Sequence, residues 1–194
     1  MRPAQTSLLL AGALTLSGAL LAAAPQVGNP APEFTLTTVD GKTFSLAEAA
    51  KSHKAVVIMF IATKCPYSNA YNDRMRDLAA AYAKQGILFA GINSNKTEPA
   101  DEVIAHAKQH GLAFPIMKDT DNKVADLYDA KHTPEIFVVD PERKLRYHGR
   151  IDENYEDASK VTSPDLKNAL DAMLGGRAIA RVETKAFGCT IKRV

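Results

Sequence analysis

The sequence predicts an α/β protein with a central mixed β-sheet and helices on both of its faces. Two short apolar runs rich in β-branched residues, 55–62 and 87–92, are typical of fully buried strands. An amphipathic helical pattern separates them, and a strand–helix–strand crossover places its two strands parallel. Further along, two strand patterns flank the turn at 140–143, and this hairpin adds antiparallel strands to the sheet.

The segment before the first buried strand is predicted to hold a hairpin and a short helix. Residues 25–33 are rich in proline, which predicts an extended lead-in. Residues 34–39 alternate weakly between apolar and polar, and Asp40-Gly41 is a strong hairpin turn before the strand continues to Phe44. A helix is expected over 45–53, capped by its first residue, a serine.

A long helix is predicted directly after the strand at 55–62. Pro66 suits the first helical position, because its missing N–H costs nothing there. Apolar side chains then recur every three or four residues, at Tyr67, Tyr71, Met75, Leu78 and Tyr82. Gly86 ends this helix, and the second buried strand follows it.

The second half of the chain continues the alternation of helices and strands. Pro99 opens a helix that ends before Gly111. The remaining predicted elements are a strand at 114–117, a helix at 121–130, a strand at 136–140, its return strand at 144–151 and a helix at 163–174. Residues 177–194 show no clear period.

The first 24 residues have the pattern of a secretory signal peptide. Arg2 is their only charge, residues 8–24 are apolar or small, and three alanines at 22–24 supply a cleavage site. The alternative is a membrane anchor, for which the apolar run is short. We therefore expect a signal peptide over 1–24, a globular domain over 25–176, a C-terminal tail over 177–194, and export to the periplasm or, as a second choice, secretion.

Composition and charge exclude several function classes. The net charge is only +2, so neither nucleic acid nor a membrane surface is an expected partner. The five histidines and two cysteines form no tight metal-ligand pattern, and no metal or other cofactor is predicted. Both cysteines, Cys65 and Cys189, lie after the leader, and an even pair in an oxidising compartment is typical of a disulfide.

Cys65 is the leading candidate for a reactive group. It lies between a buried strand and the start of a helix, where unpaired N–H groups and a partial positive charge favour the thiolate. Lys64 next to it adds a positive charge. The alternative is that Cys65 is an inert, buried core residue, as free cysteines often are.

Two motifs resemble the thioredoxin-like superfamily in its redoxin branch, which is related to the alkyl hydroperoxide reductase and thiol-specific antioxidant proteins. Phe60-x-Ala62-x-x-Cys65-Pro66-Tyr67-Ser68 is similar to the redox motif of that family, and His132-Thr133-Pro134 is similar to its cis-proline loop. The resemblance covers about residues 27–174. It implies a thioredoxin fold, Cys65 as the nucleophile, and a cis Thr133–Pro134 bond that turns the Thr133 backbone toward the cysteine to pair with an extended substrate.

The sequence also departs from the family pattern. Ser68 stands where the usual motif has a second cysteine; it can hydrogen-bond the thiolate but cannot form a disulfide. Met59 replaces a buried acid. The peroxidase pattern Pro-x-x-x-Thr/Ser-x-x-Cys reads Ile58 and Ala62 at its first two positions, so peroxidase activity has weak support.

Three hypotheses remain open. The first is an exported thiol–disulfide oxidoreductase in which Cys65 attacks, Thr133 and Pro134 shape the substrate groove, and Cys189 is the candidate resolving thiol. The supporting residues are Ser68, Lys64, Pro66, Tyr67 and Arg74. The second is a peroxiredoxin-like antioxidant peroxidase, and the third is a non-enzymatic metal- or partner-binding module with Cys65–Cys189 as a structural disulfide. The enzymatic hypotheses imply a disulfide-bearing protein, small thiol or peroxide as substrate and an external thiol or thioredoxin-type electron donor.

Overall fold

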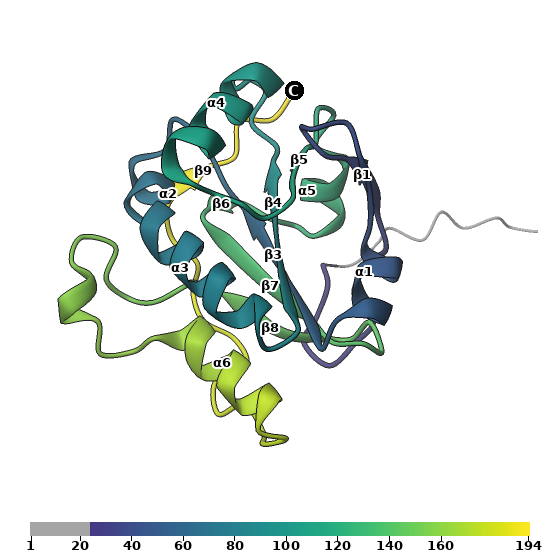
Figure 1. Ribbon diagram of the computed structural model, residues 1–194, viewed down its shortest axis with the longest axis vertical. Helices are drawn as coiled ribbons and strands as arrows, with labels where there is room; N and C mark the ends of the chain where they lie inside the picture. Colours follow the sequence, from purple (N-terminus) through teal and green to yellow (C-terminus); the bar gives the residue numbers. More distant parts are fainter. Residues whose placement is uncertain (1–23) are drawn as a thin grey trace, which may run out of the picture.

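The computed structural model describes residues 24–194, and almost all of the predicted signal peptide lies outside this range. Its main sheet has five strands in the order β5 (Ile116–Lys118), β4 (Ile87–Asn93), β3 (Ala55–Phe60), β7 (Glu135–Val139) and β8 (Leu145–Gly149) (Figure 1). β3, β4 and β5 are parallel, whereas β7 runs antiparallel to both β3 and β8. The predicted mixed sheet is therefore confirmed.

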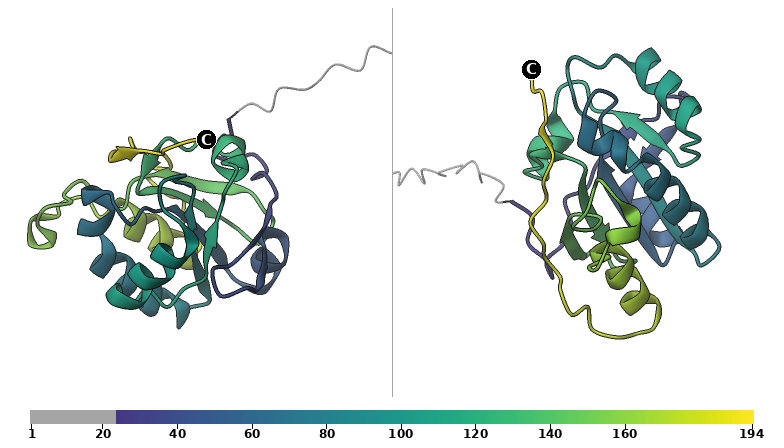
Figure 2. Two further views of the ribbon diagram at one scale, coloured as in Figure 1. Left: turned by 90° about the horizontal axis from the view of Figure 1, so that it is seen from above. Right: turned by 90° about the vertical axis from the view of Figure 1, so that its left-hand side faces the viewer.

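The central strand β3 separates two hydrophobic cores. All six of its residues are buried, and successive side chains point to opposite faces of the sheet. Val56 and Ile58 pack in one core with helices α1 (Leu46–Ser52) and α5 (Lys123–Leu127). Val57 and Met59 pack in the other core with α3 (Asn72–Ala83), α4 (Ala100–His110) and α6 (Asp165–Leu174). Helices thus cover both faces, as Figure 2 shows.

The long helix predicted after β3 is two helices. α2 (Pro66–Ala70) ends just before Tyr71, and α3 begins just after it. Tyr71 is 1% exposed, and its hydroxyl donates to the Asp152 carboxylate at 2.8 Å. The break between α2 and α3 therefore coincides with the burial and hydrogen bond of Tyr71. The spacing of apolar residues every three or four positions does not predict it.

The smaller elements frame the sheet. The predicted hairpin is β1 (Thr35–Thr37) with β2 (Thr43–Ser45), and the Ser45 hydroxyl caps α1 by accepting from the Glu48 N–H. Three short elements lie outside the predicted pattern: β6 (His132–Thr133), a 3₁₀ turn (Ala158–Lys160) and β9 (Cys189–Thr190).

The tail over residues 177–194 folds back along the domain (Figure 2). Its first part follows the edge of β8, where His148 exchanges backbone hydrogen bonds with Val182 and Thr184. Its last part buries Ile191, which is 4% exposed, in the core that also holds α1 and α5. The tail is therefore an integral part of the fold.

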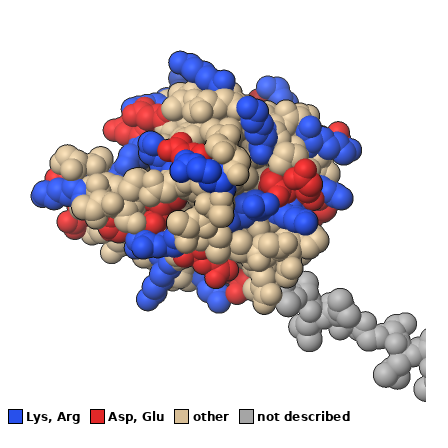
Figure 3. Space-filling view, turned by 90° about the horizontal axis from the view of Figure 1, so that it is seen from below, with Lys and Arg blue, Asp and Glu red and all other residues tan. Residues whose placement is uncertain are grey.

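The surface matches the small net charge. Acidic and basic side chains are interspersed over the face that Figure 3 shows. Among residues 24–194, no helix has the length and apolar character that crossing a membrane requires.

Candidate active site

Cys65 lies directly before α2, five residues after the end of β3. It occupies the N-cap position, and its sulfur accepts a hydrogen bond from the Ser68 N–H at 3.4 Å. Pro66 takes the first helical position, as expected. The thiol is 3% exposed and donates to the Thr133 carbonyl at 3.1 Å. The cysteine and the Thr133-Pro134 loop, 68 positions apart in sequence, are therefore in direct contact.

The loop that carries Thr133 is held by the buried carboxylate of Glu135. The Thr133–Pro134 peptide bond is cis. Glu135 is 4% exposed and accepts from the N–H groups of Lys131 and His132 at 2.7 and 2.9 Å, and its other oxygen lies 2.8 Å from the His148 ring. Burial raises the pKa of Glu135, but these hydrogen bonds outweigh burial and the net direction is down.

Cys189 lies beside Cys65. β9 lies beside β6 (Figure 1) and pairs with it antiparallel, in a register that puts Cys189 opposite Thr133. Both cysteines are free thiols in the structure. Cys189 is partly exposed, whereas Cys65 is covered. The fold thus brings together two thiols that are 124 positions apart, although the tail has no sequence period to predict it.

The surroundings of the two thiols separate their pKa values. Burial raises the pKa of Cys65, but hydrogen bonds from the Cys189 side chain and the Ser68 N–H, together with the adjacent Thr133 side chain, outweigh burial, so the pKa is lowered. Burial and the neighbouring Cys65 raise the pKa of Cys189 above its usual value. Of the pair, Cys65 therefore has the lower pKa and is the stronger candidate nucleophile.

Three aromatic rings hold the tail next to the motif. Tyr67 packs against Tyr155 with ring centroids 4.4 Å apart, and Phe187 of the tail lies 6.2 Å from both rings. Aromatic pairs at such separations add to the energy of burial. Tyr67 thus supports the tail through Phe187, which lies two residues before Cys189.

A buried carboxylate that the sequence did not single out fixes the loop before Cys65. Glu98 is 1% exposed and accepts from the N–H groups of Thr63 and Lys64 at 2.9 and 3.1 Å. The side-chain amides of Asn93 and Asn95 also donate to it, at 2.5 and 3.0 Å. No sequence pattern marks this residue, because its partners come from loops that only the fold brings together.

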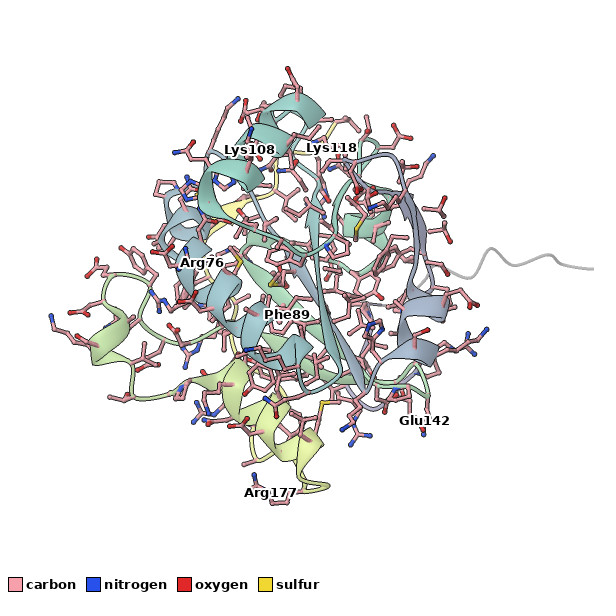
Figure 4. The ribbon with its side chains drawn as sticks, in the orientation of Figure 1. Arg76, Phe89, Lys108, Lys118, Glu142 and Arg177 are labelled. Carbon is pink, nitrogen blue, oxygen red and sulfur yellow. The ribbon has the colours of Figure 1, made fainter. Side chains whose placement is uncertain are left out.

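The same network reaches the tail. Lys118, labelled in Figure 4, donates to the Asn93 side chain at 2.7 Å and to the Asn95 carbonyl at 2.6 Å. The Asn95 side-chain oxygen accepts from the Lys192 N–H at 2.7 Å. The loop before Cys65 and the chain just after Cys189 therefore share one set of polar contacts.

Two supporting residues have polar groups that are held by partners other than Cys65. The Ser68 hydroxyl accepts from the Ala62 N–H at 3.1 Å, so it is the Ser68 backbone that reaches the sulfur. The Lys64 ammonium is drawn away by Glu102, 2.8 Å from it. In both cases a closer partner holds the polar group and Cys65 does not.

Arg74 is also engaged elsewhere. Its guanidinium donates to the buried Asp152 carboxylate at 2.7 Å and to the carbonyls of Asn154 and Tyr155, and it lies over the Tyr71 ring at 4.2 Å. Within residues 24–194 none of its hydrogen bonds goes to Cys65. Arg74 thus ties α3 to the loop after β8.

Comparison with known proteins identifies the family. The model of the AhpC/TSA family matches residues 27–148, which is more than half of the chain. The chain belongs to the AhpC/TSA family. This confirms the redoxin resemblance, and the matched range contains Cys65 and Pro134 but ends before the tail.

Named relatives and solved structures agree with this family. The thiol-disulfide oxidoreductase ResA of Bacillus subtilis is 30% identical over 118 residues, which is 61% of this chain. The match spans 64% of that relative, slightly less than two thirds of its length. The ResA of Geobacillus thermodenitrificans is 30% identical over 120 residues, 62% of this chain and 67% of the relative.

Two solved structures match over nearly the whole chain. A hypothetical protein from Sinorhizobium meliloti 1021 has a TM-score of 0.80 and 34% identity, covering 89% of this chain and 97% of that one. An uncharacterized conserved protein from Geobacillus kaustophilus has a TM-score of 0.80 and 35% identity, covering 86% and 92%. A putative thiol:disulfide interchange protein DsbE from Chlorobium tepidum, at 20% identity and a TM-score of 0.66 over 78% of this chain and all of that one, shows the fold alone. The thioredoxin fold is thereby confirmed.

Proposed function

We propose that the protein is a thiol–disulfide oxidoreductase in which Cys65 attacks and Cys189 resolves. The observation that carries this proposal is the contact geometry: Cys65 at a helix start, with Cys189 as the strand neighbour of Thr133. The names of the relatives, thiol-disulfide oxidoreductases, support the reaction class.

The reaction would proceed by two thiol–disulfide exchanges. The Cys65 thiolate attacks one sulfur of a substrate disulfide; that S–S bond breaks, and the other substrate sulfur leaves as a thiolate. Cys189 then loses its proton to solvent and attacks the Cys65 sulfur, and the substrate leaves as its second thiolate. The product is a reduced substrate and a Cys65–Cys189 disulfide. An external thiol or thioredoxin-type donor reduces that disulfide and closes the cycle.

The cellular location is part of the proposal. The leader over residues 1–24 supports export to the periplasm, where such a donor must also act. The globular domain over 25–176 would hold the nucleophile, and the tail over 177–194 would supply the resolving thiol.

One observation favours peroxide as a second class of substrate. The Thr133 hydroxyl is buried and has no hydrogen-bond partner among residues 24–194, and its side chain lies beside the Cys65 sulfur. A small oxidant at the sulfur would find this hydroxyl free to donate. Peroxide consumption by the reduced protein, monitored against the Cys65→Ser variant, separates this activity from disulfide exchange.

The test of the main proposal uses two single-cysteine variants, each reduced beforehand and freed of small thiols, mixed with a protein disulfide. Cys65→Ser should reduce none of the substrate. Cys189→Ser should still attack and accumulate one mixed disulfide on Cys65, visible by intact mass. Full activity of Cys65→Ser would show that the nucleophile is assigned wrongly.

A further inference from the structure

The strand position next to the Thr133 backbone is occupied by the chain's own tail. β6 pairs with β9 in the register His132 with Thr190 and Thr133 with Cys189. An extended segment of another protein that paired with Thr133 would need this same edge. The tail therefore shows what the edge accepts.

A glycine directly before Cys189 is required by this arrangement. Gly188 has φ +146°, a backbone conformation that side chains rarely adopt. A Cβ at this position would lie 2.8 Å from the Thr133 carbonyl carbon and closer still to its oxygen. Any larger residue would push the cysteine away from Cys65.

Apolar contacts fix the tail on both sides of the cysteine. Two residues before it, Phe187 packs on Tyr67 and Tyr155. Two residues after it, Ile191 is buried in the core, and its N–H donates to the Lys131 carbonyl at 3.0 Å. The segment bound at this edge thus has the five-residue pattern aromatic, glycine, cysteine, any residue, apolar.

We propose that the segment Phe187–Ile191 mimics a bound substrate segment. The site then selects extended substrate segments that have an aromatic residue and a glycine before the reacting cysteine. An apolar residue follows two positions after that cysteine. This rests on the proposed function. The substrate and the tail compete for one edge, so the tail must swing out before a protein disulfide can reach the covered Cys65.

Competition for one edge also gives the tail a part in product release. When the substrate segment leaves the edge, the tail returns to it and brings Cys189 against the Cys65–substrate bond. The Cys189 thiolate then forms the Cys65–Cys189 bond, and the substrate sulfur takes the electron pair of the broken bond.

The test uses full-length variants and a peptide of residues 186–192, AFGCTIK, whose cysteine carries a thionitrobenzoate leaving group. Cys65 attacks the peptide sulfur and releases the coloured thionitrobenzoate, so the rate is read by absorbance. Matched peptides replace the glycine or the phenylalanine with alanine. The two proteins are Cys189→Ser, with the tail docked, and Cys189→Ser combined with Gly188→Ala, with the tail loosened.

The loosened variant should take up the parent peptide at least about tenfold faster than either alanine peptide and about tenfold faster than the docked variant does. Equal rates for the three peptides would overturn the proposal. If the double variant does not fold, discrimination among peptides by Cys189→Ser alone, at high peptide concentration, decides the question in the same way.

Oxidised glutathione serves as a small control disulfide. If Cys65 reacts with glutathione disulfide but with no peptide, the substrate proposal is wrong and the proposed function stands. If Cys65 reacts with neither, the proposed function itself fails.

Discussion

Replacing Glu98 with glutamine tests whether this buried carboxylate holds the loop before Cys65. The carboxylate accepts four hydrogen bonds, two on each oxygen: Lys64 N–H and Asn95 on one, Thr63 N–H and Asn93 on the other. In Glu98→Gln one oxygen becomes an NH₂ group, which faces two donors. Two hydrogen bonds to a charged group are lost, each worth about 1.5–3 kcal/mol.

The neighbouring amides are unable to rescue the glutamine without a further loss. Turning the Asn93 amide over would give up its bond from Lys118, and turning Asn95 over would give up its bond from the Lys192 N–H. We therefore expect Glu98→Gln to lower the free energy of unfolding by about 3 kcal/mol or more.

Urea unfolding of the full chain measures this loss, with Glu102→Gln as the matched control. Glu102 is partly exposed, pairs with the Lys64 ammonium and accepts from the Thr63 hydroxyl. Partly exposed pairs of this kind contribute up to about 1 kcal/mol. If Glu98→Gln costs no more than Glu102→Gln, the four-bond carboxylate does not stabilise the loop and the reasoning is refuted.

Three further outcomes are expected. The rate of alkylation of Cys65, measured by peptide mass at a series of pH values, should fall with an inflection below the free-thiol pKa of about 8.5. The reason is that a lowered pKa keeps the reactive thiolate present at lower pH. An inflection at or above the free value contradicts this. Ser68→Ala should lower the free energy of unfolding by about 1–3 kcal/mol, since the buried Ala62 N–H loses its acceptor, and should leave the pH of that inflection nearly unchanged because the backbone bond to sulfur remains. Arg74→Ala should cost about 3 kcal/mol in urea unfolding by leaving the buried Asp152 carboxylate without its cation, and a shift of the alkylation inflection in this variant would restore Arg74 to the active site.

Much of the fold could be predicted because it depends on local patterns. The apolar runs at 55–62 and 87–92 are long enough to fix buried strands, and Pro66 and Gly111 mark helix ends that the structure retains. The break at Tyr71 could not be predicted in this way. It accompanies a contact with Asp152, 81 positions away, and helical periodicity carries no information about such a contact.

In the candidate site, too, the residues in local motifs could be predicted, whereas the contacts between distant residues could not. Cys65 and Thr133 stand in local motifs, so the sequence places both, and the structure puts them in contact. The positions of Ser68, Lys64 and Arg74 in the sequence suggested a shared role near the sulfur, but their polar groups have nearer partners in Ala62, Glu102 and Asp152. Which of several partners a polar group takes depends on the three-dimensional packing.

The tail shows the limit most clearly. Residues 177–194 have no helical or strand period, because each anchor, such as Phe187 or Ile191, contacts a different part of the domain. Sequence reasoning could name Cys189 as the only other thiol, but it left open whether that thiol is catalytic, structural or unused. The pairing of β9 with β6 brings Cys189 beside Thr133. No sequence pattern predicts that register, which is seen only in the folded structure.

The most direct test of the central claim is a redox titration of the native, full-length protein, with the disulfide state read by intact mass and peptide mapping. We expect a Cys65–Cys189 bond that forms and opens reversibly in the folded protein as the ratio of reduced to oxidised thiol buffer is varied. A bond that opens only under denaturing conditions would make the pair structural. The absence of that bond at every ratio would remove Cys189 from the mechanism and contradict the account.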